Sequence, residues 1–262
     1  MKQLLLCFLL YIILSCIGCQ KDYYAYDIEL WRNTEVWDFA KCISTKRFRD
    51  AEELLNENRY NIDYREPKFG ETLLSWAVWN DDIDAVRFLV EHGANPNVHK
   101  KSNGLSPISE AAGDFSSIEI LKCLLEHGGD PNDFVRENEV VTYARSNKTP
   151  LIGAAFVSLE KTKLLIEYGA DANFAIEPGH TAFTQATFRT TLDVLDYLLH
   201  NCEIDYKRTY IVTLDTGDTL FLKDLIINNT VACRQDSVKA EQIIDYIEKN
   251  YEIGTDSVLI SK

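Results

Sequence analysis

Apolar and polar residues recur along the chain in an order that predicts a series of short helices. Four segments share this order, and each begins with a hydroxyl residue: Thr72–Ala77, Ser106–Ala111, Thr149–Ala154 and Thr181–Ala186. Aliphatic residues three or four positions apart follow each segment, which marks one apolar face of a second helix. The segments start 34, 43 and 32 residues apart, and self-similarity with such a period predicts a stack of small helical units.

Each repeat carries its own start and stop signals. The hydroxyl at the start can accept a hydrogen bond from a free backbone N–H of the helix. Pro107 and Pro150 follow at the first helical position, where a missing N–H costs nothing. The second helix is expected to end at a residue suited to left-handed backbone. These stop positions are Gly93, Gly128, Gly169 and, in the fourth unit, Asn201.

The segments resemble the ankyrin repeat, which has a period of about 33 residues and the signature T-P-L-H-x-A. The resemblance covers residues 35–206 and implies an all-α solenoid of five to six helix-turn-helix repeats with short β-turn tips; an ordinary helical bundle is the alternative. Residues 36–63 fit a degenerate first repeat. Residues 207–262 fit a degenerate terminal repeat or cap, in which Thr219 is expected to begin a helix. The histidine of the signature is replaced in all four copies, so its bridge between repeats is expected to be missing; the replacements are Ser75, Ser109, Ile152 and Thr184.

The first residues have the pattern of an export signal. Residues 4–18 are almost wholly apolar, and as a helix they would span about 22 Å, less than the roughly 30 Å of a hydrocarbon core. Residues 1–18 therefore predict a secretory signal peptide. An uncleaved anchor helix and a plain secreted protein are the alternatives.

The end of this segment resembles the cleavage box of bacterial lipoproteins. On that resemblance Cys19 receives the lipid, with Cys16 as the second candidate, and residues 19–34 form a tether. The tripeptide Gln20-Lys21-Asp22 resembles a surface-export signal of Gram-negative lipoproteins. The expected location is therefore the outer membrane, on its periplasmic or cell-surface side, with membrane contact through the lipid anchor only.

The charge balance limits the kind of partner. The formal net charge of −14 argues against nucleic acid and against anionic lipid headgroups, since both require basic patches. A basic protein partner fits this charge, because opposite charges speed encounter. Solubility alone is the other explanation. The chain is expected to be a monomer.

Signatures of catalysis, cofactors and metals are missing from the sequence. It contains no Cys-x-x-Cys, no His-Glu-x-x-His, no Gly-x-Ser-x-Gly and no glycine-rich phosphate loop. His92 and His127 precede helix-ending glycines, and a cation at a helix C-terminus explains them better than a metal site. We expect no cofactor, no metal and no enzymatic activity, while a site in the long connection 133–147 is the enzyme alternative.

Two further sequence features concern covalent chemistry. Cys202 and Cys233 fall in neighbouring units and can pair in an oxidising compartment. The triplets that begin at Asp218, Asp236 and Asp256 resemble O-glycosylation sites of bacterial secreted proteins.

By exclusion, the sequence predicts a protein that binds another protein through its concave face, where turn tips and first helices project. Aromatic and basic residues are favoured anchors of such interfaces. The expected contact residues are Lys68, Phe69, Lys100, Lys101, Phe174 and His180 at the tips, and Trp76, Trp79, Asp114, Phe156 and Arg189 on the first helices. For Trp76 and Trp79, packing in the core is the alternative. An immunity or inhibitor protein against a toxin or enzyme is a special case of this function.

Overall fold

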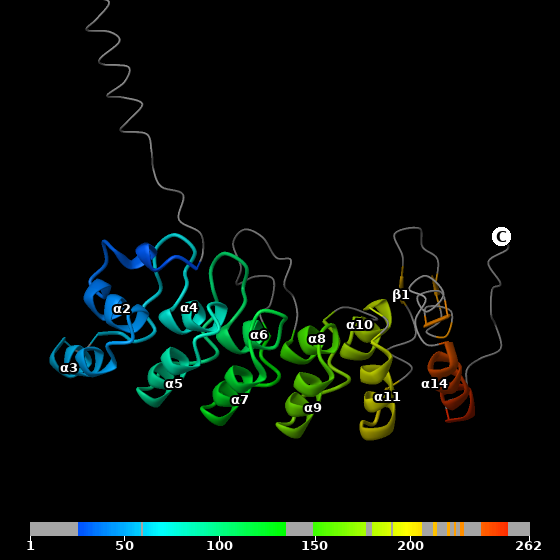
Figure 1. The fold of residues 1–262 in the computed structure, drawn as a ribbon. Helices are drawn as coiled ribbons and strands as arrows, with labels where there is room; N and C mark the ends of the chain where they lie inside the picture. Colours follow the sequence, from blue (N-terminus) through cyan, green and yellow to red (C-terminus); the bar gives the residue numbers. More distant parts are fainter. Residues whose placement is uncertain are drawn as a thin grey trace, which may run out of the picture.

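The computed structural model describes residues 26–58, 60–134, 149–176, 180–189, 191–205, 212–213, 219–220, 223, 226–227 and 237–250. In these residues the chain forms helix pairs laid side by side in a row (Figure 1). The first helices of the pairs are α2 (Trp37–Ser44), α4 (Leu73–Trp79), α6 (Pro107–Ala111), α8 (Pro150–Ala155) and α10 (Ala182–Arg189). The second helices are α3 (Phe48–Asn58), α5 (Ile83–Glu91), α7 (Ile118–Glu126), α9 (Leu159–Glu167) and α11 (Leu192–Asn201).

Three further features lie at the ends of the row. The 3-10 helix η1 (Ile28–Trp31) precedes α2 and packs against it. Strand β1 (Val212–Thr213) pairs antiparallel with β2 (Thr219–Leu220), and α14 (Ser237–Asn250) packs against α11. Among the helices described, none has the length and apolar character required to cross a bilayer.

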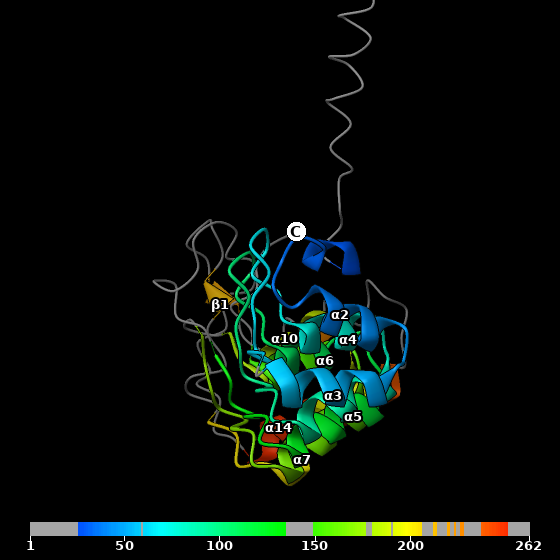
Figure 2. The same ribbon diagram turned by 90° about the vertical axis from the view of Figure 1, so that its left-hand side faces the viewer.

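The helices form two layers with the core between them. From α4 onwards each first helix contacts the next first helix, and from α5 onwards each second helix contacts the next second helix. Figure 2 views the stack from its N-terminal end, with the tips projecting on one side. Apolar side chains such as Leu74, Leu89 and Leu124 are fully buried between the layers, and burial of each contributes about 1.5–3 kcal/mol. The fold is therefore an all-α solenoid of helix-turn-helix repeats, as the sequence predicts.

The predicted start signals are confirmed. The hydroxyl oxygens of Thr72, Ser106, Thr149 and Thr181 each accept a hydrogen bond from the backbone N–H three residues later. These bonds satisfy a donor that the first helical turn leaves without a partner.

Most of the predicted stop signals are confirmed as well. Gly93, Gly128 and Gly169 have φ of 92°, 90° and 90°, so the chain leaves each second helix through left-handed backbone. The expectation for Asn201 is wrong, because α11 includes this residue and ends in extended backbone at Cys202. The expected helix start at Thr219 is also wrong, because Thr219 pairs with Thr213 in a strand, a position that β-branched residues favour.

Asparagine side chains link successive repeats. Asn97, Asn132 and Asn173 repeat one arrangement: the side-chain amide donates to a carbonyl of the next repeat, and the amide oxygen accepts from a backbone N–H there. The carbonyl that accepts and the N–H that donates belong to Gly128 and Asp130 for Asn97, to Gly169 and Asp171 for Asn132, and to Glu203 and Asp205 for Asn173. The donor–acceptor distances are 2.6–3.0 Å. We call this set the asparagine ladder.

A second link involves one of the four residues that replace the histidine of the signature. Ser109 stands in the histidine slot, and its hydroxyl donates to Asp133 Oδ2 at 3.3 Å. The same carboxylate accepts from Ser106 Oγ and contacts His99 Nε2 at 2.8 Å through its other oxygen. Asp133 therefore ties its own repeat to the preceding one through side chains that sequence patterns do not pair.

Replacing Asn132 by alanine should lower the free energy of unfolding by about 1–3 kcal/mol, because a carbonyl and an N–H of the next repeat lose their partners. Urea denaturation measures the loss. Asn201→Ala is the matched control, since among the described residues the Asn201 side chain donates to Tyr197 O within its own helix. Equal losses in the two variants would contradict a role of the ladder between repeats.

Candidate functional site

A hollow of about 270 Å³ opens beside the first helices of three successive repeats. It lies among the end of α4, helix α6 with the loop that follows it, and α8. We call it the aromatic hollow, and it is lined by Trp79, Leu105, Ser109, Glu110, Gly113, Asp114, Phe115, Ser116, Thr149, Gly153, Phe156 and Val157. Three residues predicted to contact a partner, Trp79, Asp114 and Phe156, are thus brought together here.

Aromatic side chains form one side of the aromatic hollow. The rings of Trp79 and Phe115 have centroids 5.0 Å apart, tilted by 34°, and Tyr26 stacks on Trp79 at 5.6 Å. Phe115 keeps 68% of its surface exposed. An exposed aromatic cluster of this kind is typical of interaction sites, because aromatic anchors carry much of the energy of protein interfaces.

The loop that carries Asp114 and Phe115 is held by a buried lysine from another repeat. Lys161 donates from Nζ to the carbonyls of Ala111 at 2.9 Å, Gly113 and Ser116 at 2.6 Å. Burial lowers the pKa of Lys161, and the ammonium supplies the partners that these carbonyls at the end of α6 need. The loop is therefore fixed before any partner arrives, which reduces the entropy lost on binding.

Beneath the aromatic hollow lies a buried cluster of three charges. Lys100 Nζ contacts Glu71 Oε1 at 2.6 Å and Glu110 Oε1, and all three side chains are at most 4% exposed. The ammonium also lies 5.9 Å from the centroid of the Trp79 ring. Within the described residues the Oε2 atoms of both glutamates have no hydrogen-bond partner. One cation thus faces two carboxylates, and one oxygen of each carboxylate has no hydrogen-bond donor among the described residues.

Burial sets the protonation of this cluster. It raises the pKa of Glu110 to about 7 and also raises the pKa of Glu71, although Lys100 opposes both shifts. For Lys100 burial acts in the opposite direction, but the two carboxylates outweigh it and hold its pKa above the usual value. The lysine therefore stays charged, while Glu110 titrates near neutral pH.

The other predicted contact residues fall into separate groups. Lys68, Phe69 and Lys101 lie at two neighbouring tips, where the backbone N–H groups of Lys68 and Phe69 donate to the buried Glu66 carboxylate. Gly70 has φ of 73°, and a Cβ there would lie 2.9 Å from Lys101 Cβ, so the two tips touch. Lys68 and Lys101 are exposed, and the Lys68 ammonium lies 4.9 Å from the centroid of the Phe69 ring.

Two of the predicted contact residues are buried instead. Trp76 is 8% exposed and its Nε1 donates to Tyr26 O at 2.9 Å, so the core alternative describes it. Lys100 does not project from its tip as expected, because the two glutamates draw its ammonium inwards.

The remaining ones lie towards the C-terminus. Phe174 packs against Phe134 with ring centroids 5.4 Å apart, and His180 Nε2 lies 3.1 Å from Gln185 Oε1. The side chain of Arg189 lies outside the described residues.

Sequence reasoning missed Phe115 and Glu110. A signal for Phe115 exists, since it is an aromatic residue in a loop between helices where polar residues prevail. Glu110 has no such signal, because its significance depends on Lys100 and Trp79 from other segments.

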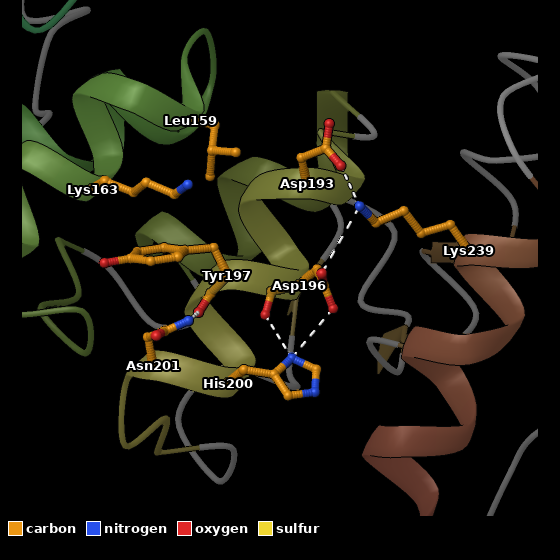
Figure 3. Close-up of a pocket in the computed structure, with 8 residues that line it drawn as sticks. All are labelled: Leu159, Lys163, Asp193, Asp196, Tyr197, His200, Asn201 and Lys239. Carbon is orange, nitrogen blue, oxygen red and sulfur yellow. Dashed lines mark hydrogen bonds and ion pairs between the residues drawn. The ribbon is translucent and has the colours of Figure 1, made fainter.

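A second hollow, of about 400 Å³, lies among α9, α11 and α14 (Figure 3). Lys239 of α14 forms ion pairs with Asp193 and Asp196, and His200 Nδ1 lies 3.2 Å from Asp196 Oδ1. The opposite charges meet here in partly exposed positions, where an ion pair contributes about 0–1 kcal/mol to the free energy of unfolding. This hollow is a solvated polar surface that joins α14 to the stack.

Several predictions concern residues outside the described part of the chain. These are the lipidation at Cys19 or Cys16, the Cys233 member of the predicted pair with Cys202, the glycosylation triplet that begins at Asp256, and nearly all of the connection 133–147. The described residues contain no group of three or more His, Cys, Asp or Glu side chains arranged to hold a metal ion.

Replacing Glu110 by glutamine should change how stability depends on pH. Because the pKa of Glu110 is 4.5 in the reference state and about 7 when folded, folding takes up a proton between these values. The stability contributed by Glu110 is therefore full below about pH 4.5 and is lost as pH rises through 7. Urea denaturation across this range should show the wild type losing about 1–3 kcal/mol relative to Glu110→Gln. A difference that stays constant with pH would contradict the raised pKa.

Comparison with known proteins agrees with this geometry. Residues 41–135 match the family model of ankyrin repeats, in three copies. The fold is similar to the crystal structure of an ankyrin repeat domain from Acinetobacter baumannii AYE, with a TM-score of 0.59 and 20% identity over 80% of this chain and 97% of that one. A search of curated proteins gives no match. Residues 41–135 therefore match ankyrin repeats, and the chain has the ankyrin-repeat fold.

Proposed function

We propose that the chain is a lipid-anchored envelope protein whose repeats bind a protein partner through the side that carries the aromatic hollow. Ankyrin repeats generally mediate protein–protein interaction. The observation that carries the proposal is the exposed ring of Phe115 beside Trp79, on a loop that Lys161 holds in place. Stability alone poorly explains a large exposed aromatic side chain on a loop that a buried cation holds in place.

The N-terminal segment supports an envelope location. The apolar residues 4–18, the small residue before Cys19, and Gln20-Lys21-Asp22 favour an exported lipoprotein of a Gram-negative outer membrane. From Cys19 to Tyr26, which stacks on Trp79, seven residues span at most about 25 Å. A lipid on Cys19 would therefore hold the aromatic hollow close to the membrane, and the partner would be met at that surface.

Other functions fit less of the structure. An inhibitor or immunity protein is the case in which the partner is a toxin or enzyme, and the same surface serves it. An enzyme with a site near residues 133–147 would use a segment that lies almost wholly outside the described residues.

Lipidation predicts a difference between two cysteine variants. In cells fed radiolabelled palmitate, Cys19→Ala should abolish labelling and release the protein from the membrane fraction, since acyl chains supply the membrane affinity. Cys16→Ala is the control and should keep both. Label that is retained in Cys19→Ala but lost in Cys16→Ala would show that Cys16 carries the lipid. The absence of label in the wild type would contradict the lipoprotein proposal.

If the partner binds in the aromatic hollow, a side chain that fills the hollow should abolish binding. Gly153 lines the hollow from α8, and among the described residues a Cβ there would meet Ala112 Cβ alone, at 4.0 Å. Gly153→Leu should therefore fold well, because leucine has the better helix propensity, while its side chain occupies the hollow. The tagged full chain, solubilised from envelopes in mild detergent, should capture one stoichiometric protein that Gly153→Leu loses.

The matched control is Lys122→Leu, which adds the same side chain at an exposed position on the second helix α7. This variant should keep the partner, and circular dichroism should show both variants folded. Capture that is unchanged in Gly153→Leu would contradict binding through the aromatic hollow.

A further inference from the structure

The aromatic hollow combines two features that a partner side chain must match. One is the aromatic wall of Trp79 and Phe115, whose ring faces carry partial negative charge. The other is Glu110, which lines the hollow, has a side chain that is 4% exposed, and has an Oε2 atom without a hydrogen-bond partner among the described residues. A buried carboxylate with unused acceptor capacity is costly unless something compensates it.

The charges around the hollow do not balance. Glu71, Glu110 and the exposed Asp114 are acidic, whereas Lys100 is the cation shared by the first two. Lys161 is a second cation in this region, and it directs its donors at three backbone carbonyls. With all groups ionised, the three carboxylates face two ammonium groups, so the region keeps one excess negative charge.

We propose that the aromatic hollow receives an arginine side chain of the protein partner. This rests on the proposed function and names the chemistry of its central contact. A planar guanidinium stacks on aromatic faces and is more weakly hydrated than an ammonium, so it enters an apolar-walled hollow at lower cost than lysine does. It also directs several donors at once, which suits Asp114 at the rim and Glu110 in the lining.

The same features disfavour other occupants. A carboxylate or phosphate would meet Glu110 and Asp114 with like charge. An apolar side chain would satisfy the rings but would cover Glu110 further and give it no donor. A cationic group also favours the ionised form of Glu110, whose pKa of about 7 leaves it part-protonated before binding.

Small probes test the contact without the partner. The full chain is labelled with 5-fluorotryptophan, which gives resonances for its four tryptophans, and Trp79→Phe assigns the one at the hollow. The probes are the Nα-acetyl amides of arginine, of its neutral isostere citrulline, of lysine and of norleucine. We expect the arginine probe to shift the Trp79 resonance saturably at millimolar concentration, with citrulline binding about tenfold more weakly.

Two variants separate the parts of the site. Asp114→Asn changes an exposed residue and should weaken the arginine probe several-fold while leaving the citrulline probe unchanged. Glu110→Gln should act in the same direction, and Asp114→Asn keeps the test decisive if Glu110→Gln does not fold. Asp196→Asn, in the polar hollow beside α14, is the matched control and should leave all affinities unchanged.

Several results would overturn the assignment. These are equal binding of arginine and citrulline, tighter binding of norleucine or lysine, the absence of a saturable shift of the Trp79 resonance, or equal effects of Asp114→Asn and Asp196→Asn. The outcome is distinguishable from failure of the proposed function. Partner capture that Gly153→Leu abolishes, together with a negative probe titration, would leave a partner that uses a different side chain.

Discussion

No helix pair of this chain can cover its own apolar face, and the stack follows from that constraint. A pair such as α6 and α7 exposes apolar surface on two sides, and only a neighbouring pair on each side removes it from water. Residues such as Leu89 and Leu124 are fully buried for this reason. The side chains that project from the first helices and tips are thereby released from packing, which makes them available for recognition.

Apolar burial has little directional preference, so polar contacts set the geometry between neighbours. The asparagine ladder fixes the relative position of the turns that follow successive second helices, and Asp133 adds a link to the preceding repeat through His99. Lys161 does the same on the side of the first helices, where it holds the loop that presents Phe115. These buried or bridging groups are costly to leave without a partner, so each one restricts the stack to a single register.

The repeats were predictable from the sequence because their signals are local. A threonine hydroxyl caps an N–H three residues away, and a glycine ends its own helix, so position in the chain decides both. The candidate site was predictable only in part. Trp79, Asp114 and Phe156 stand out by type, but Lys100 reads as an exposed tip residue until Glu71, 29 residues earlier, is placed beside it. Contacts of this range depend on which loop packs on which helix, and no local pattern records that.

Within the described residues the asparagine ladder ends at Asn173, which donates to the carbonyl of Glu203 and accepts from the backbone N–H of Asp205. Beyond that point α14 is attached by the buried Ile243 and Ile247 and by the solvent-facing pairing of Lys239 with Asp193. Charge pairs of this kind weaken as ionic strength rises, whereas the amide links do not. Fraying of the solenoid should therefore begin at α14, and a rise in ionic strength should favour it slightly, while the repeats around Trp79 stay folded.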